Sequence, residues 1–527
     1  FFKQKTAYEI KECDWSSDVC SSDLLGYSCF DLIIVSEEDA RALASKSPER
    51  WRAMMDWIRA GASLIVFGVD AGEAGTSGLE KLVGLPRGGG VWREPEFSAR
   101  NSENVVAEKN AGYYRNTVPV SPNANSDQGD SESASAAEAS ETSSADQAAV
   151  ADFRWRSLGM GRLFALPTPD PFASKLPWAW ILNTIGSDQN WFERYGMSMH
   201  RSNSGFWNFL VRGVGRPPGV WFLLLISIFM IVAGPVNYLM LRSRGKLALL
   251  LVTVPAGSFM VTICLLAYSL LSDGLGVQWR CRSVTVLDSN RGTAVSWSRH
   301  SYFAGLAPRS GLEFPRDAAV YPLEFDPAES LGQFGAAHAV TWSGTQRLQS
   351  GYFSSRTPTQ FLVVRSGECD ARLEVREGSA AQQPPQVVNN LGVVILGMVL
   401  RDSRGDLWRP EGKSEAGAEL VHATEEEARD YLREKLQPWI LEANATGVAP
   451  VNSYRWNFVA VDPYSQVAPD TSSSMLESEI KEFHSAARLH ALMPRSWVAI
   501  VDRSPHVVPG VAKVEAQDDL HLILGSY

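Results

Sequence analysis

Two long uncharged runs constrain this chain more than any other feature. Val220–Leu241 reads VWFLLLISIFMIVAGPVNYLML, and Leu247–Leu271 likewise contains no Asp, Glu, Lys or Arg. About 20 apolar residues in a helix, at about 1.5 Å each, cross the roughly 30 Å hydrocarbon core of a bilayer. A buried helix of a soluble protein rarely avoids charge over such a length, and two in tandem weaken that alternative. We therefore expect a transmembrane hairpin.

The charges around the two runs predict its orientation. Arg242, Arg244 and Lys246 lie in the short loop between the runs, and short cation-rich loops stay in the cytoplasm. Competing cations flank the hairpin on its other side: Arg212, Arg216, Arg280 and Arg282. Because these four are fewer per residue or farther from the bilayer, we expect both soluble regions to face outward from a bacterial cytoplasmic membrane.

Three features inside the runs bear on helix geometry. Gly234-Pro235 and Pro255 are expected to kink the spans, since proline removes a backbone hydrogen bond. Asn237 is the one strongly polar side chain of the first span. It is expected to form an interhelical polar contact with the second helix, and a transport role for this residue alone is the weaker alternative.

Composition excludes some classes of function. The net charge is −10, with 49 basic and 59 acidic residues, which disfavours a nucleic-acid partner. The cysteines after residue 24 are scattered singly, without the pairs or neighbouring histidines of a metal site. No cofactor, metal or catalytic residue is predicted, and the expected partners are the lipid bilayer and other envelope proteins.

The first residues, FFKQKTAYEIKECDWSSDVCSSDL, show no hydrophobic period. Lys3–Ile10 and Asp14–Leu24 resemble the translated constant halves of an indexed sequencing-library adapter, with Lys11–Cys13 at the index. The alternative is a short exposed extension. Adapter-derived residues lie outside the fold, so we expect a gene truncated at its 5′ end and no core residue within Phe1–Leu24.

A β–α–β pattern follows. Phe30–Ser36 and Ala62–Gly68 are short apolar runs typical of buried strands. Between them, Ser47-Pro48 is suited to begin a helix, and Gly61 to end it. Since both strands are apolar throughout, they are expected to be parallel and covered on both faces.

This unit resembles part of a class I glutamine-amidotransferase-like domain of the flavodoxin type, on the residues FDLIIVS and WIRAGASLIVFG. Active members carry a cysteine on a tight elbow after a strand, followed by a histidine and an acid. Here Cys29 precedes its strand, and the first later histidine is His200, next to the membrane. The resemblance therefore implies the fold of an inactive relative.

The region after the membrane reads as β-rich. Runs suited to strands and separated by turn residues predict a β-sandwich: Ser283–Asp288, Thr293–Trp297, Ala339–Trp342, Gln360–Val364, Ala371–Val375, Val393–Arg401, Trp497–Asp502 and His521–Leu524. Two helices interrupt them. Thr424 begins one with a capping box and extends it to about Ala443, and Ser473–Met493 forms the other.

The predicted organisation is thus a multidomain membrane protein, divided as follows: 1–24 adapter, 25–120 α/β amidotransferase-like, 121–150 disordered insertion, 151–219 continuation of the α/β domain, 220–241 and 247–271 transmembrane helices, 242–246 cytoplasmic loop, 272–527 β-rich extracytoplasmic domain. The whole resembles a loosely defined group of uncharacterised bacterial membrane proteins, on Gly234–Arg242, Val254-Pro255 and Tyr268. That resemblance implies a non-catalytic, membrane-anchored envelope scaffold or binding protein. The alternatives are an amidotransferase- or hydrolase-like enzyme, which a reactive Cys29 or Cys369 would favour, and an accessory subunit of a transport or signalling complex.

Overall fold

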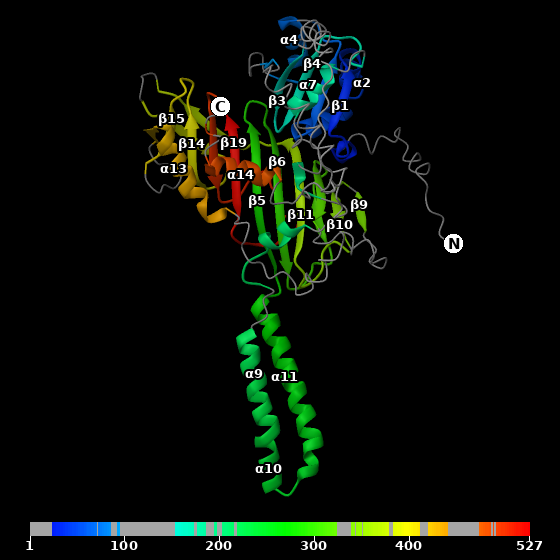
Figure 1. Ribbon diagram of the computed structural model, residues 1–527, viewed down its shortest axis with the longest axis vertical. Helices are drawn as coiled ribbons and strands as arrows, with labels where there is room; N and C mark the ends of the chain where they lie inside the picture. Colours follow the sequence, from blue (N-terminus) through cyan, green and yellow to red (C-terminus); the bar gives the residue numbers. More distant parts are fainter. Residues whose placement is uncertain are drawn as a thin grey trace, which may run out of the picture.

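The computed structural model describes residues 24–70, 72–85, 92–94, 153–172, 176–185, 194–197, 203–214, 219–323, 339–342, 344–349, 351–378, 383–411, 420–440, 474–485, 489 and 492–527. The residues before and after the hairpin lie on the same side of it and pack together into one body (Figure 1). The hairpin projects from one end of that body, and its connecting loop lies at the far tip.

The N-terminal part forms a four-stranded sheet in the order β1-β2-β4-β3. Its elements are η2 (Leu24–Tyr27), β1 (Leu32–Ser36), α2 (Glu37–Lys46), α3 (Pro48–Arg59), β2 (Ser63–Phe67), α4 (Glu73–Leu82), β3 (Arg154–Leu158), β4 (Gly161–Leu166) and α7 (Leu176–Ile185). Strands β1, β2 and β4 are parallel, and β3 runs antiparallel to β4. The parallel β–α–β pair expected from the sequence is confirmed.

Local sequence explains the start and end of the helices in this unit. The Ser36 hydroxyl accepts a hydrogen bond from the Asp39 backbone N–H at 3.0 Å and so caps α2, a helix that the sequence analysis missed. Pro48 occupies the first turn of α3. Gly61 has a φ of +128°, which turns the chain from α3 into β2.

The hairpin consists of two helices that are long and apolar enough to cross a membrane. The first is α9 (Gly219–Ile231), a π-helical turn η5 (Val232–Val236) and α10 (Asn237–Ser243); the second is η6 (Leu247–Leu249) and α11 (Leu250–Asp273). The π turn contains Pro235, whose ring cannot fit beside the carbonyl one turn earlier. None of the most apolar window of either helix is buried by the rest of the protein, so the hairpin is not a core element of the soluble body.

After the hairpin the chain forms a ten-stranded sheet in the order β16-β15-β14-β17-β19-β5-β6-β11-β8, with β18 also paired to β5. Its strands are β5 (Val277–Asp288), β6 (Thr293–Ala304), β8 (Ala318–Leu323), β11 (Thr359–Glu368), β14 (Ile395–Arg401), β15 (Leu407–Pro410), β16 (Leu420–Ala423), β17 (Ser496–Val501), β18 (Glu515–Ala516) and β19 (Leu520–Ser526). Strand β19 is parallel to β5, although most of the chain after the hairpin separates them.

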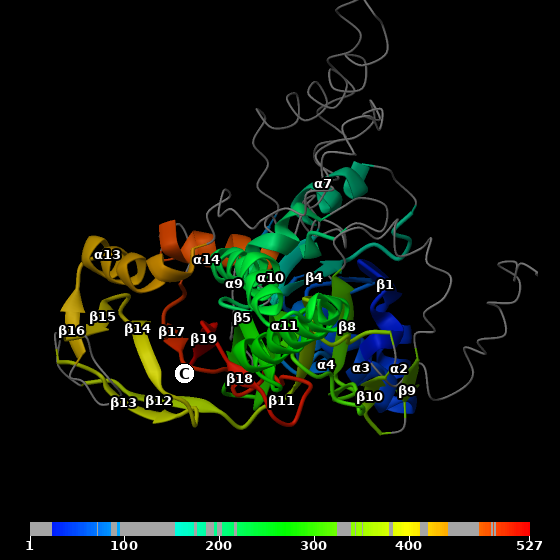
Figure 2. The same cartoon turned by 90° about the horizontal axis from the view of Figure 1, so that it is seen from below.

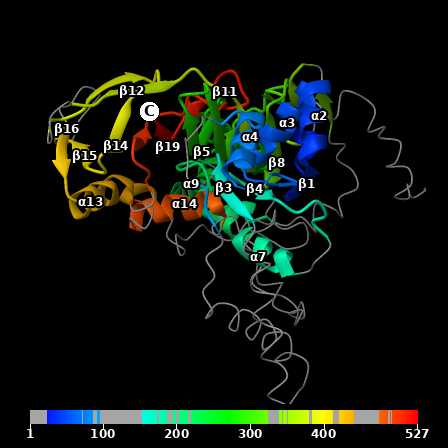
Figure 3. The ribbon, with the colours of Figure 1, turned by 90° about the horizontal axis from the view of Figure 1, so that it is seen from above.

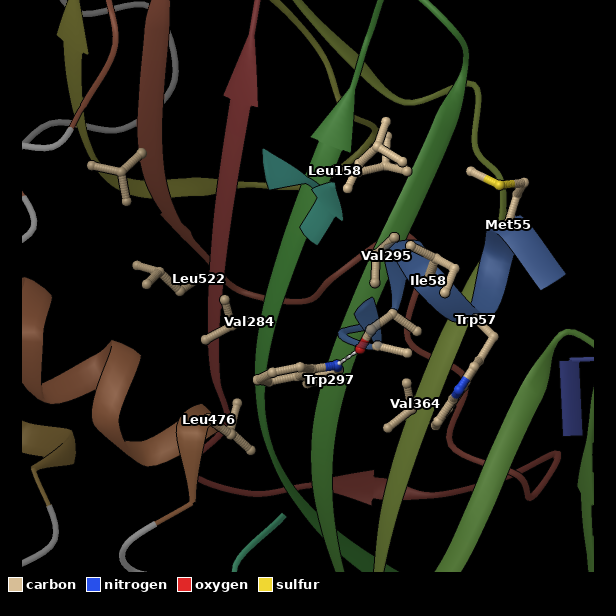
Figure 4. Packing of buried hydrophobic residues seen from close by; sticks show 14 of the residues in the cluster. Met55, Trp57, Ile58, Leu158, Val284, Val295, Trp297, Val364, Leu476 and Leu522 are labelled. Carbon is tan, nitrogen blue, oxygen red and sulfur yellow. Dashed lines mark hydrogen bonds between the residues drawn. The ribbon is translucent and has the colours of Figure 1, made fainter. Parts of the chain in front are cut away.

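Helices cover one face of this sheet. Residues paired across five adjacent strands place one apolar row on that face: Val364, Trp297, Val284, Leu522 and Ile500. Helices α3, α13 (Glu425–Leu436) and α14 (Met475–Ser485) supply the opposing side chains. Figure 4 shows Met55 and Ile58 of α3, together with Leu476 of α14, around this row.

Two small sheets cover the other face. They are β7 (Leu312–Phe314), β10 (Gln346–Leu348) and β9 (Val340–Trp342), and the hairpin of β12 (Arg372–Arg376) and β13 (Gln386–Asn390). Each packs on its own cluster of apolar residues from the large sheet. Viewed from below and from above, α13 and α14 lie on one side of β14, and β12 lies on the other (Figure 2, Figure 3).

The N-terminal unit is fastened to the large sheet through α3. The Trp297 indole donates a hydrogen bond to the carbonyl oxygen of Ala60 at 2.7 Å (Figure 4). Gly61 packs so closely that a Cβ there would lie 2.8 Å from the Trp297 ring. Tyr195, also fully buried, meets the same ring edge to face at 6.2 Å. The regions that precede and follow the hairpin in sequence therefore share one hydrophobic core.

Several predictions are corrected here. Leu24 is only 3% exposed and packs in the shared core, so the expectation of no core residue in Phe1–Leu24 is wrong at its last position. The β-sandwich is met in part, since small sheets cover one face and helices the other. Helix α13 ends at Leu436, before Pro438, and α14 at Ser485, both earlier than expected. The adapter-like residues 1–23, the insertion 121–150 and His200 lie outside the described residues.

Candidate functional site: the joint between the soluble body and the hairpin

The segment that leads into the hairpin is buried against the large sheet. A short 3-10 helix, η4 (Ser204–Phe209), lies against the ends of β5, β6 and β11 that are nearest the hairpin, and the Phe209 side chain is fully buried. Three guanidinium groups surround its ring, with Cζ to centroid distances of 4.7 Å for Arg280, 5.0 Å for Arg299 and 5.8 Å for Arg282. We call this set, Phe209 with Arg280, Arg282 and Arg299, the arginine joint.

Strand geometry brings the three arginines together. Arg280 and Arg282 are two residues apart on β5, so both side chains point to the helix-covered face. Arg299 of β6 is paired directly with Arg282. Like charges opposite each other in a sheet are destabilising, and burying them adds a desolvation cost. Such an arrangement is stable only where nearby π electrons, carbonyl oxygens and carboxylates offset the charge.

Backbone carbonyls of the η4 segment provide much of this compensation. Arg280 donates to the carbonyl oxygen of Leu210 at 3.0 Å, and Arg299 donates to that of Gly205 at 2.7 Å. Gln360 of β11 hydrogen-bonds both to Arg299 and to the backbone of η4. Its side-chain oxygen accepts from Arg299 at 2.9 and 3.1 Å, and its amide donates to Phe206 and Phe209 carbonyls at 2.6 and 3.1 Å. These carbonyls belong to η4 and to Leu210, the residue that follows it.

Two carboxylates complete the joint. Asp518 lies 2.9 Å from Arg280 and 3.1 Å from Arg212, and Glu477 of α14 lies 3.4 Å from Arg282. Burial lowers the pKa of Arg280 to about 10 and also lowers the pKa of Arg282, because a charged guanidinium is poorly solvated there. Arg280 and Arg282, which the sequence analysis counts among the cations that flank the hairpin, are therefore buried groups.

The exit from the hairpin is equally direct. Helix α11 ends at Asp273 and β5 begins at Val277, so the chain passes from the second helix into the centre of the large sheet. The segment that precedes the first helix packs on the neighbouring part of the same sheet through the arginine joint. The described segments before and after the hairpin therefore both contact β5 or continue into it.

At the far tip, the three cations expected to determine topology are exposed. Arg242, Arg244 and Lys246 lie at the end of α10 and in the connecting loop. Nearer the tip than the body, Asn237 donates a hydrogen bond to the Thr253 hydroxyl of α11 at 2.8 Å. This contact joins the two helices beside the π turn.

A second cluster, missed in the sequence, lies on the opposite face of the sheet. The Ser283 hydroxyl is 2.7 Å from Nδ1 of His521, and Nε2 of His521 is 3.9 Å from Asp519. The carboxylate of Asp519 accepts from the backbone N–H of Cys281 at 2.7 Å. Ser283 and His521 are fully buried, so this serine, histidine and acid set is enclosed by the sheets that cover it.

Two further histidines line the same face. His300 contacts the Trp279 indole at 3.1 Å, the Ser298 hydroxyl at 2.7 Å and the Tyr302 hydroxyl at 3.1 Å, and Ser296 contacts His506 at 3.0 Å. Burial lowers the pKa of both His300 and His506 to about 3. The period of two in Ser296, Ser298 and His300 was the available signal, since it places polar groups on one face of a strand.

The residues considered for chemistry in the sequence do not come together. Cys29 is exposed ahead of β1, and Cys369 is half-buried at the end of β11. Thr424 and Glu427 form the expected capping box at the start of α13. Within the part of the chain that the structure describes, no group of three or more His, Cys, Asp or Glu could hold a metal ion.

Comparison with known proteins adds no relative. No protein-family profile, curated protein or solved structure matches the chain.

Proposed function

We propose that this chain is a non-catalytic, membrane-anchored scaffold or binding protein of the bacterial cell envelope. Its hairpin spans the cytoplasmic membrane, and its soluble body lies on the outer side. Two observations support this arrangement. The apolar helices are unburied by the body, and the cations Arg242, Arg244 and Lys246 gather at the tip opposite to it.

The arginine joint is the observation that carries the scaffold role. An anchor that only retains a protein at the membrane needs no more than a flexible linker. Here the segment before the first helix is held by buried hydrogen bonds and by three cations on Phe209, and the second helix continues almost directly into β5. This construction holds the body in a defined orientation on the membrane, as a scaffold that presents a binding face requires.

For the N-terminal unit we propose an inactive relative of the class I glutamine-amidotransferase-like, flavodoxin-type domains. The parallel strands β1, β2 and β4 with their helices support this assignment. Cys29 precedes β1 rather than following a strand, so it does not occupy the nucleophile position of active members. The unit then serves as a packing or recognition module.

A hydrolase is the second candidate, because the Ser283 hydroxyl contacts His521 and the other ring nitrogen of His521 lies near the Asp519 carboxylate. Their burial argues against it, since catalysis by such a set needs a substrate at the serine. A fluorophosphonate probe would test the point. We expect no labelling that depends on Ser283, and labelling abolished by Ser283→Ala in a folded protein would favour the hydrolase. An accessory role in a transport or signalling complex would instead show as stable co-purification with other membrane subunits.

The orientation is tested by thiol labelling in spheroplasts. All cysteines except buried Cys281 are replaced by serine, and single cysteines are introduced at Val388, exposed on β13, and at Ser243 in the tip. A membrane-impermeant maleimide should label Val388→Cys in intact spheroplasts and Ser243→Cys only after permeabilisation. The reverse pattern would place the body in the cytoplasm, and equal labelling of both would refute a spanning hairpin.

A further inference from the structure

Two exposed leucines lie on the end of the body from which the hairpin projects. Leu275 is 64% exposed and follows α11 by two residues; Leu306 is 67% exposed and follows β6 by two residues. Exposed leucines scattered singly are common on protein surfaces. These two are not scattered, because the turns that carry them touch each other.

The contact between the turns depends on glycines. The backbone N–H of Gly305 donates to the carbonyl oxygen of Gly276 at 3.0 Å. A Cβ on Gly305 would overlap the carbonyl oxygen of Gly274 and lie 3.0 Å from the Cα of Leu275. The strand register explains why, since Val277 of β5 is paired with Ala304 of β6. Leu275 and Leu306 are therefore held side by side at the open end of the β5–β6 strand pair, where β5 begins and β6 ends.

A third loop holds this end of the sheet rigid. The Arg356 backbone N–H donates to the carbonyl oxygen of Ala304 at 2.7 Å, and the Ala307 N–H donates to the Ser355 hydroxyl at 2.8 Å. Arg309, three residues beyond Leu306, is exposed. Leucines on a fixed turn lose little conformational freedom on insertion into an apolar layer, and an exposed arginine three residues along the chain from Leu306 is suited to the phosphates of lipid headgroups.

The position along the chain identifies what covers the leucines. The apolar run of the second helix continues to Leu271, so in a spanning hairpin residues 272–276 lie at the membrane surface. A side chain fixed beside Leu275 lies at the same depth. We infer that Leu275 and Leu306, the rim leucines, insert into the lipid interface and hold the body against the bilayer at a point outside the two helices. This inference rests on the proposed membrane-spanning hairpin, and its occupant is the lipid surface rather than another protein.

Single-cysteine probes in the full chain test this inference. On the background lacking all cysteines but Cys281, an NBD fluorophore is attached at Leu306→Cys, at Phe172→Cys and at Leu251→Cys. Phe172 is a matched control, since it is 68% exposed but lies beside α7 at the end of the body far from the hairpin. Leu251, exposed on α11, reports insertion of the hairpin itself. The protein is reconstituted in vesicles of phosphatidylcholine with or without phosphatidylglycerol, and with lipids that carry a spin label near the headgroup or deeper in the chain.

We expect the Leu306 probe to show blue-shifted emission and quenching by the shallow spin label, the Leu251 probe, near the tip end of its span, to be quenched by the lipid spin labels, and the Phe172 probe to show neither effect. Quenching at Leu251 without quenching at Leu306 would overturn the rim while leaving the membrane anchor intact. A blue shift at Leu306 without lipid quenching would indicate a protein partner and would also overturn it. Absence of quenching at Leu251 would refute the spanning hairpin, and with it the proposed function.

Discussion

Replacing Phe209 by leucine tests whether the arginine joint is held by the aromatic ring or only by apolar packing. Leucine keeps an apolar side chain at the centre of the joint but removes the π electrons that face three guanidinium groups. Arg280 and Arg299 lie at 4.7 and 5.0 Å from the ring centroid, well inside the range of a cation–π interaction, and Arg282 lies at 5.8 Å near its limit.

The expected magnitude follows from these distances. Buried cation–π pairs contribute about 1 to 2 kcal/mol each, so the two close pairs and the distant one together contribute about 3 kcal/mol. The loss of packing volume on changing phenylalanine to leucine adds roughly 1 kcal/mol. Phe209→Leu should therefore destabilise the body by about 4 kcal/mol.

Phe361 provides the control. It is also fully buried in the large sheet, but its ring meets Tyr302 edge to face at 6.0 Å rather than a cation. Phe361→Leu should cost only about 1 to 2 kcal/mol, for lost packing and one aromatic pair. Urea unfolding of the full chain in detergent, followed by tryptophan fluorescence, gives both values. Equal losses for the two variants would show that Phe209 acts as an ordinary core residue and would refute the reasoning.

Three other experiments test separate features. Burial raises the pKa of Asp56 to about 6, so the folded state binds more protons than the unfolded state between about pH 4 and 6, and the free energy of unfolding falls as pH rises through this window. In urea titrations, Asp56→Asn should therefore be as stable as wild type near pH 3.5 and more stable by about 2 kcal/mol at pH 7.5. Burial lowers the pKa of His300 to about 3, so this group affects stability in the opposite direction. Its contribution to the free energy of unfolding is present above pH 6.5 and is lost as pH falls toward 3, by about 1.4 kcal/mol per pH unit. His300→Gln should flatten that slope in the same titrations. Gly61→Ala places a Cβ 2.8 Å from Trp297 at a positive φ, whereas the Cβ of Gly68→Ala, also at a positive φ, meets nothing within 4 Å. In thermal unfolding the first variant should lose about 2 to 3 kcal/mol of stability and the second about 1 kcal/mol. Equal losses would exclude a steric contribution from Trp297.

The features predicted from the sequence are those whose causes lie within a few residues. Two uncharged runs suffice to locate the helices of the hairpin, and Thr424 with Glu427 marks the start of α13 through reciprocal hydrogen bonds. The same reasoning should have found α2, since Ser36 is followed by Glu37, Glu38 and Asp39 at its first turn.

The candidate site could not be predicted in this way, because its parts come from distant segments. Arg282 and Arg299 meet only through the register of β5 and β6, and Phe209 comes from the segment that precedes the hairpin in sequence. Near a membrane span an arginine is ordinarily read as a solvated topological charge. Burial of Arg282 depends instead on carbonyls, a ring and Glu477, none of which is adjacent in sequence.

The parallel pairing of β19 with β5 also sets an order of events during synthesis. Ser283 and His521, which face each other across that pair, are 238 residues apart. At about 5 to 20 residues per second, a ribosome needs roughly 10 to 50 s to make that stretch. Throughout this interval β5 has one open edge, a state prone to pairing with other chains. In the proposed membrane-spanning arrangement, attachment to the hairpin would keep that edge at the bilayer, and a chain that ends before Leu520 would leave the gap between β17 and β5 unfilled.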